Sequence, residues 1–296
     1  MLPRWLRGAR AMRALVTGGS GFLGRQIVVA LRMAGVEVAA PARRQADLLR
    51  DAGRQAAAAA GAELLVHAAW VTRPAEYWRS PDNVAWTAAT IDLVRRFAAA
   101  GGRRAVLVGS CAEYDWASAA PGPWPESRPC RPQTPYGAAK LLAWTWLRGC
   151  GLSVANARVF WPVGLHEHPE RLLPRLIRAA AGGPRLPVGP ADLTRDLIDV
   201  RDAGAAVAAL ALSPVTGVVN IGAGQPVSLA TLAALVAGPA PPPVRFGGRP
   251  LPQGEPLCML PDTTRLRQEV GFTPRISLGR TLRDAAAHWQ QPARAA

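Results

Sequence analysis

The sequence predicts an α/β fold, a doubly wound parallel sheet followed by a smaller C-terminal substrate-binding lobe. Short apolar runs alternate with helix-like segments from residue 12 to about residue 160. A glycine-rich turn at 18–24 joins the first apolar run to the first helical segment. Beyond residue 160 the regular alternation ends, and proline- and glycine-rich segments appear. Alternation of this kind is typical of a parallel sheet with helices on both faces, so we expect the architecture to change where it ends.

The composition fits a folded protein and excludes several classes. With 296 residues, of which 49% are hydrophobic and 19% charged, the chain can bury a sizeable core. No apolar run approaches the roughly 18 residues of a membrane span, so we expect a cytoplasmic protein with no membrane partner. The four cysteines show no paired metal-ligand spacing, which favours reduced thiols and no metal site. Residues 1–11 are expected to be a disordered leader, and either Met1 or Met12 can be the true start.

The net charge of +15 raises the question of a nucleic-acid partner. The arginines are scattered along the chain, and no basic run with interleaved aromatic residues is present. We therefore expect no nucleic-acid binding and assign part of this charge to an anionic small substrate.

The glycine-rich turn has the context of a dinucleotide-binding site. The strand-like run Arg13–Thr17 leads directly into it, and the helical segment 25–34 follows. In such a Rossmann-type unit, glycines make the tight turn, let the backbone approach a pyrophosphate and pack the helix on the strand, while free N–H groups at the helix start face the phosphates. The predicted cofactor contacts in this turn are Gly18, Gly21, Phe22, Leu23 and Gly24.

The end of the second strand, Val36–Ala40, indicates which nicotinamide cofactor is bound. An NAD site usually places an acidic residue there for the ribose hydroxyl, but this chain has none. Arg43 and Arg44 follow instead, and they suit a 2′-phosphate, so NADP(H) is favoured and NAD(H) is the alternative. The same two arginines can also be a solvated surface pair. Asp47 is expected either to bind the adenine or to cap a helix that starts at Leu48.

The remaining segments supply the other walls of the predicted site. The strand around 63–67 ends in Ala68 and Ala69, which let the backbone pass close to a cofactor, and His67 is expected to be structural. The strand 105–109 delivers Ser110, and a proline-rich loop leads to a helix from Tyr136. Further segments are expected as helices at 82–100, 171–180, 202–212 and 278–289, strands at 154–160 and 218–221, and a loop at 182–192. We expect a cofactor domain at 12–160 with returns near 196–222, and a lobe formed by 161–195 and 223–296.

Tyr136 and Lys140 form the predicted catalytic pair. Lys140 is the only lysine in a chain with 35 Lys and Arg residues, and it follows one of three tyrosines by one helical turn. Residues at i and i+4 share a helix face, and a nearby ammonium lowers the pKa of a phenol, which is ordinarily about 10. With Ser110 holding the oxygen on which charge develops, the three residues predict hydride transfer between a carbonyl and an alcohol.

These motifs resemble the extended short-chain dehydrogenase/reductase family, which acts mainly on nucleotide sugars. The resemblance runs from about Met12 to Trp289. Segment 17–24 is similar to the family's phosphate loop, Tyr136 and Lys140 to its active-site pair, and Ser110 to its catalytic Ser/Thr. Segment 158–164 resembles the stretch after the catalytic helix in UDP-galactose 4-epimerase, and segment 194–200 the stretch whose arginine contacts the substrate diphosphate. The resemblance implies a homodimer through helices 82–100 and 136–148, and substrate contacts at Cys111, Ala112, Trp161, Arg195 and Arg249.

Departures from the family pattern sort the possible reactions. Cys111 and Ala112 stand where nucleotide-sugar 4,6-dehydratases carry an Asp-Glu pair, so a dehydratase is not expected. Trp161 replaces an asparagine common in the epimerases. Cys111 with His166 or His168 is similar to the Cys/His pair of GDP-fucose synthase, but offset by one position. We expect an NADP(H)-preferring reductase of a 4-keto nucleotide-linked deoxysugar. The alternatives are an NAD-dependent nucleotide-sugar 4-epimerase and a non-catalytic nucleotide-binding protein on the same fold.

Overall fold

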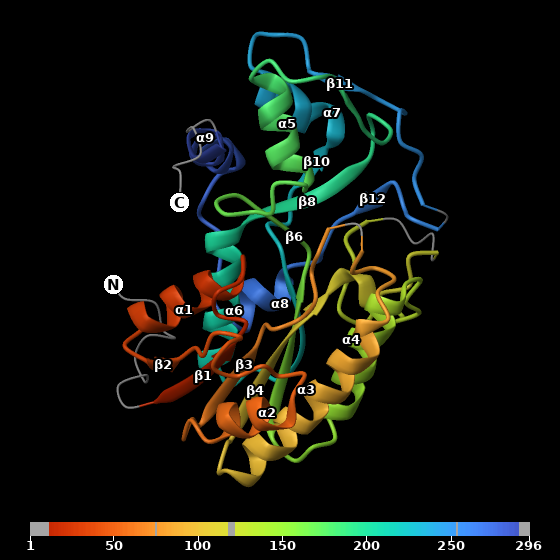
Figure 1. Cartoon of the computed structure of the whole chain (residues 1–296). Coiled ribbons are helices and arrows are strands. Elements are labelled where there is room, and N and C mark those ends of the chain that lie inside the picture. Colours follow the sequence, from red (N-terminus) through yellow and green to blue (C-terminus); the bar gives the residue numbers. More distant parts are fainter. Residues whose placement is uncertain (1–11, 75, 118–121, 253, 290–296) are drawn as a thin grey trace.

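The fold is built on a six-stranded, wholly parallel sheet in the order β2-β1-β3-β4-β5-β9 (Figure 1). This computed structural model describes residues 12–74, 76–117, 122–252 and 254–289, so the expected leader 1–11 lies outside the described residues. The strands are β1 Arg13–Thr17, β2 Glu37–Ala39, β3 Leu64–His67, β4 Arg104–Ser110, β5 Ser153–Val159 and β9 Gly217–Ile221. The predicted doubly wound α/β class is confirmed. The strand order reverses between β1 and β3, which is where open α/β sheets place their ligands.

Helices cover both faces of this sheet (Figure 1). One face packs against α1 Gly24–Met33 and α6 Val200–Leu212. The other packs against α2 Asp51–Ala58, α3 Asp82–Ala99 and α4 Pro135–Leu147. Strand β1 shows why the sequence folds this way: Ala14 and Val16 join the first core cluster and Leu15 the second, all with no exposed surface. A parallel strand buried on both faces is therefore apolar at successive positions.

A smaller mixed sheet with its own helices forms the C-terminal lobe. Strand β8 Thr194–Asp199 is antiparallel to β10 Pro226–Ser228 and parallel to β12 Cys258–Met259 and β6 Trp161–Val163. The pair β7 Leu186–Pro187 and β11 Val244–Arg245 is separate. The core of the lobe holds residues of α5 Leu172–Ala180, α7 Leu229–Ala237 and α9 Leu278–Trp289. The short helix α8 Thr264–Gln268 instead packs Leu266 into the core of the main sheet.

Three details differ from the expected elements. Helix α2 begins at Asp51, so a helix starting at Leu48 is wrong; Asp47 instead accepts a hydrogen bond from the Leu49 N–H at 3.2 Å within a turn. The expected loop 182–192 contains β7, because Leu186 pairs with Val244. Helix α7 was not expected. The division into 12–160 with returns near 196–222, and 161–195 with 223–296, stays a prediction.

The described part of the chain holds no helix that is long and apolar enough to cross a membrane.

Candidate active site

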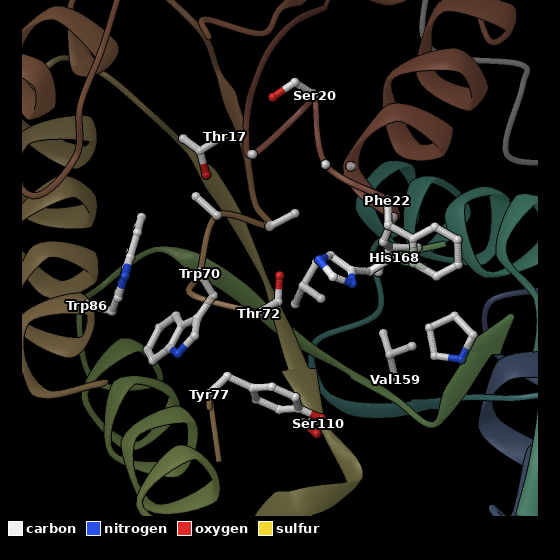
Figure 2. Close-up of a pocket in the computed structure, with 18 of the residues that line it drawn as sticks. Thr17, Ser20, Phe22, Trp70, Thr72, Tyr77, Trp86, Ser110, Val159 and His168 are labelled. Carbon is white, nitrogen blue, oxygen red and sulfur yellow. The ribbon is translucent and has the colours of Figure 1, made fainter. Parts of the chain in front are cut away.

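A cavity of about 660 Å³ lies at the carboxyl ends of the parallel strands and holds most of the predicted site residues (Figure 2). Residues that follow β1, β3, β4 and β5 line it, and the segment after β6 closes it. Four predicted site residues do not line this cavity: Arg44, Ala112, Arg195 and Arg249. The predicted residues that do line it are Gly18, Gly21, Phe22, Leu23, Gly24, Arg43, Asp47, Ala68, Ala69, Ser110, Cys111, Tyr136, Lys140 and Trp161.

The turn after β1 is packed so closely that only glycine fits at its ends. Gly18 has a φ of +71°, and a Cβ there would lie 2.6 Å from the backbone nitrogen of Ala69. A Cβ on Gly24 would lie 2.0 Å from the carbonyl oxygen of Gly18. No side chain caps the start of α1. The N–H groups of Arg25 and Gln26 donate to the carbonyls of Gly21 and Leu23, whereas those of Phe22, Leu23 and Gly24 have no acceptor among the described residues and are available to phosphate oxygens. The turn therefore fits the pyrophosphate of a dinucleotide.

Of the two arginines that follow β2, one lines the cavity and the other does not. Arg43 lines the cavity, and its Nε lies 3.4 Å from Asp47 Oδ2. Arg44 is exposed and lies outside the lining. Of the two arginines predicted for a 2′-phosphate, the structure thus places Arg43 at the cavity, partly neutralised by Asp47.

Ser110 and Tyr136 face each other from two elements. Ser110 ends β4 and caps a single 3-10 turn, Cys111–Glu113 (η2), by accepting a hydrogen bond from the Ala112 N–H. Tyr136 lies in the first turn of α4, whose start is capped by Thr134 accepting from the Gly137 N–H. Burial raises the pKa of Tyr136 well above its ordinary value, and hydrogen bonding to Ser110 lowers it only in part. The phenol is therefore protonated at neutral pH.

Lys140 lies one turn further along α4 and is almost fully buried, with 2% of its surface exposed. Its Nζ donates to the Val108 carbonyl at 2.9 Å and lies 3.9 Å from the centroid of the Trp70 ring. Burial lowers its pKa to about 7, against a raising effect of Glu113. Its Nζ lies 5.9 Å from the Tyr136 ring. The expected lowering of the Tyr136 pKa by Lys140 is not what this geometry gives, because burial of the phenol outweighs the effects that lower its pKa.

Aromatic side chains enclose the phenol of Tyr136. Its ring has edge-on contacts with Trp70 at 6.4 Å, Tyr77 at 5.0 Å and Trp78 at 5.6 Å between centroids. Trp70 is fixed by its indole N–H, which donates to Asn83 Oδ1 at 2.8 Å. Figure 2 shows Trp70, Tyr77 and Ser110 facing the same cavity, with Phe22 and His168 on its other side.

Sequence reasoning missed several of these cavity residues. Trp70, Tyr77, Glu167 and Arg171 all line the cavity. For Trp70 a signal existed, since it follows β3 at the edge of the sheet where ligands bind. The other three come from loops whose path the sequence does not reveal.

A buried ionic network supports the turn that holds Ser110. Glu113 accepts from the Ser110 N–H at 2.9 Å, from Arg158 Nε at 2.7 Å and from the Asn156 amide at 2.8 Å. Arg158 and Glu113 are 2% and 0% exposed. These contacts hold the end of β4 against β5, so Glu113 positions Ser110 and its carboxylate is fully engaged.

The predicted substrate residues are placed unevenly. Arg195 is buried in an ion pair with Glu255 at 2.5 Å, and its guanidinium lies 5.4 Å from the Trp161 ring centroid. Arg249 is exposed. Ala112 is fully buried under α4, where a Cβ on Gly137 would lie 2.1 Å from its carbonyl oxygen. Cys111 lines the cavity, but burial raises the pKa of its thiol to about 12.

The histidines near the cavity divide into a buried structural one, His67, and two loop residues that line the cavity, His166 and His168. His67 is hydrogen-bonded through Nδ1 to Thr17 at 2.7 Å and through Nε2 to Thr90 at 2.9 Å. Burial lowers its pKa to about 3, which keeps the ring neutral, as a structural residue requires. His166 has a φ of +64° and packs edge-on against His288 of α9, with ring centroids 4.8 Å apart.

Comparisons with known proteins agree with this architecture. Residues 14–222 match the NAD dependent epimerase/dehydratase family. A dTDP-glucose 4,6-dehydratase from Streptomyces niveus is 30% identical over 94% of this chain and 95% of that protein. A GDP-6-deoxy-D-mannose reductase from Pseudomonas aeruginosa is 26% identical over 95% of this chain and 98% of that protein.

Solved structures extend the likeness to three dimensions. A UDP-glucose-4-epimerase from Stenotrophomonas maltophila, with bound NAD and formylated UDP-arabinopyranose, superposes with a TM-score of 0.82. It is 23% identical and covers 94% of this chain and 98% of that chain. With the match across 14–222 and the dinucleotide turn at β1, the chain belongs to the NAD dependent epimerase/dehydratase family and is an NAD(P)-dependent enzyme of the extended short-chain dehydrogenase/reductase type.

Proposed function

We propose that this enzyme is an NADP(H)-preferring reductase of a 4-keto nucleotide-linked deoxysugar. The observation that carries the proposal is the placement of Tyr136, protonated at neutral pH, beside Ser110 in a cavity that begins at a dinucleotide turn. A protonated phenol is a proton donor, which is what reduction of a ketone requires. The similarity to a GDP-6-deoxy-D-mannose reductase supports the same direction.

The residues divide the reaction as follows. NADPH, held at the turn after β1, supplies a hydride when bound. Ser110 orients the substrate carbonyl oxygen, and Tyr136 gives it the phenolic proton, so that a ketone becomes an alcohol and Tyr136 a phenolate. Lys140 stabilises that phenolate in its ammonium form. Trp70, Tyr77 and Trp78 exclude water from the reacting group.

Elimination of water is a poorer fit, although a dehydratase is among the relatives. Dehydration needs an acid and a base next to the reacting carbons. Cys111 keeps its proton because burial raises its pKa to about 12, and Ala112 has no titratable group. Glu113, the next residue, is fully engaged with Arg158, Asn156 and the Ser110 N–H.

The choice of NADP(H) rests on Arg43. It lines the cavity just after β2, and residues 40–44 at this strand end include no acid to bind a ribose hydroxyl. We expect a higher kcat/KM with NADPH than with NADH, and Arg43→Ala should reduce the preference by about ten-fold. Equal rates with both nucleotides would contradict this part of the proposal.

The reaction is tested with purified protein, NADPH and 4-keto-6-deoxy sugars linked to UDP, dTDP or GDP. We expect stoichiometric NADPH consumption, and Tyr136→Phe should lose about 10²–10⁴-fold in kcat with nucleotide binding retained. Tightly retained NAD(H) with interconversion of 4-epimers would favour the 4-epimerase instead. A 4-keto-6-deoxy product from an unmodified hexose would establish a dehydratase. Absence of turnover with every substrate would favour the nucleotide-binding protein.

A cytoplasmic homodimer remains part of the proposal. Val84 on α3 and Leu142 on α4 are 76% and 57% exposed, and adjacent helices with apolar side chains on their surface suit contact with a second copy. Sedimentation equilibrium should give twice the mass of the chain, and Leu142→Asp should shift it towards the monomer.

A further inference from the structure

We propose that Arg171 binds an anionic group of the substrate, a phosphate or a carboxylate, in this cavity. The inference rests on the proposed function, because it takes the substrate to be an anion bound in this cavity. It assigns a role to a residue that neither the motifs nor the family resemblance pointed to, whereas the arginines expected at the substrate, Arg195 and Arg249, do not line the cavity.

The first argument is the state of the cationic side chains in the cavity. Arg43, Lys140 and Arg171 all line it. Arg43 is paired with Asp47, and Lys140 donates to the Val108 carbonyl. Within 12–74, 76–117, 122–252 and 254–289, the Arg171 guanidinium has neither a hydrogen bond nor an ion pair. A guanidinium has five donors in a planar fork that matches carboxylate and phosphate oxygens, so its donors are available to a ligand.

The second argument is where Arg171 lies. Its guanidinium carbon is 5.9 Å from the centroid of the Tyr77 ring, and that ring contacts Tyr136 edge-on at 5.0 Å. The charge of Arg171 acts to lower the pKa of Tyr77, Tyr136 and Glu167. The guanidinium is therefore separated from the proposed proton donor by one aromatic ring, and its charge still acts on that phenol.

The third argument is that Arg195 is already occupied. Its guanidinium donates to Glu255, to the Thr194 carbonyl and to the Leu257 carbonyl. A buried ion pair that loses one partner is strongly destabilised, so this pair resists exchange with a ligand. Among the described residues, Arg171 has no such partner to displace.

The experiment measures binding rather than turnover, with calorimetry on the full chain. The probes are UDP, dTDP and GDP, followed by the glucose and glucuronate conjugates of the nucleotide that binds best. We expect Arg171→Gln to weaken binding by about 10–100-fold, because a charge-assisted pair is lost. Arg171→Lys should fall between wild type and Arg171→Gln, because it keeps the charge but loses the fork.

Arg175→Gln is the matched control. It removes the same charge from α5, the helix whose N-cap residue is Arg171. Arg175 is partly exposed like Arg171, and it does not line the cavity. Its binding should stay within about two-fold of wild type. If the anion is the diphosphate, Arg171→Gln weakens every probe; if it is a carboxylate on the sugar, only the glucuronate conjugate is weakened.

Unchanged affinities in Arg171→Gln, or equal losses in Arg175→Gln, would overturn the inference while leaving the reductase proposal intact. An Arg171-dependent affinity without NADPH consumption would support the inference and count against the reductase. Failure of the wild type to bind any nucleotide would contradict both.

Discussion

Lys140 combines two properties that rarely coincide, a formal charge and almost complete burial. Its ammonium has one carbonyl acceptor, that of Val108, and the face of Trp70. Desolvation disfavours the charged form, which is why the pKa falls to about 7. The groups that face it are Glu113, which raises this pKa, and His67, whose own pKa Lys140 lowers. Lys140 therefore changes charge within the neutral pH range.

Stability should rise with pH because of this residue, and Lys140→Met should remove the rise. The folded pKa is about 7 and the usual lysine value is 10.5. Between them the unfolded chain binds one more proton than the native one, so the free energy of unfolding increases as pH rises above about 7. Below that pH both states are protonated, and the penalty for burying the charge is fully present. Urea unfolding at about pH 6.5 and about pH 8.5 measures the free energy of unfolding of wild type and of Lys140→Met.

Comparing the pH dependence of stability in wild type and Lys140→Met separates the effect of Lys140 from the opposite effect of Glu167. Burial raises the pKa of Glu167 to about 7, so the stability that it contributes is lost as pH rises towards and through that value. Glu167 is present in both proteins, and its effect cancels in the comparison. Equal pH slopes for wild type and Lys140→Met would contradict the assignment.

At the residue scale, the sequence predicted the three polar side chains of the candidate site but not the aromatic side chains packed around Tyr136. Ser110, Tyr136 and Lys140 follow from local rules, a strand end and an i, i+4 pair, and the structure brings all three to one cavity. Trp70 and Tyr77 meet Tyr136 across long sequence separations. Such contacts depend on tertiary packing, which no local pattern encodes.

At the scale of elements, the turn that ends β4 depends on a buried charge pair. Removing one partner leaves the other charge unpaired in the core, which costs about 3–5 kcal/mol. Glu113→Gln should therefore lower the free energy of unfolding by about that amount. The double variant Glu113→Gln with Arg158→Met should lose less, because no unpaired charge remains. Denaturant unfolding of the three variants measures this, and an additive double variant would contradict the coupling.

A second prediction at this scale concerns the glycine-rich turn after β1 and its affinity for NADPH. In Gly24→Ala the new Cβ would meet the Gly18 carbonyl at 2.0 Å, so the turn must move and lose its fit to a pyrophosphate. We expect affinity for NADPH to fall by about ten-fold or more, measured by calorimetry. Gly149→Ala is the control, since its nearest neighbour lies at 3.7 Å. Equal affinities of both variants would show that the turn tolerates the methyl group.

The elements were predicted unequally, for physical reasons. The five sheet strands up to β5 and the helices α3, α4 and α9 follow from clear apolar periodicity or continuous apolar runs. Helix α7 reads Leu-Ala-Thr-Leu-Ala-Ala-Leu-Val-Ala. This run is apolar at nearly every position, so it has no polar face from which an amphipathic helix could be predicted. The two- and three-residue strands of the lobe depend on their pairing partners: β6, β10 and β12 pair with β8, and β7 pairs with β11.

At the scale of the whole molecule, the two layers divide the work of the cavity. The large sheet and its helices contribute the dinucleotide turn and the predicted catalytic side chains, whereas β6 and the segment after it contribute Trp161, Glu167 and Arg171. The division into a cofactor part that comes first and a substrate part that comes later stays a prediction from the sequence. The sequence could not predict which lobe arginine reaches the cavity, because that depends on how loops 164–171 and 245–257 run.

The single buried lysine also makes the chain an unusual target for proteolysis. An endoproteinase that cuts only after lysine has one bond available, Lys140–Leu141, in the middle of α4. Cleavage requires that helix to open, either locally or with the whole fold, so its rate reports the opening of α4. We expect two fragments that appear slowly in buffer, faster in mild urea and more slowly with NADPH, and none from Lys140→Arg. Rapid cutting of the native protein would contradict the tight packing of α4, and slow cutting would measure how often the helix that carries Tyr136 and Lys140 opens.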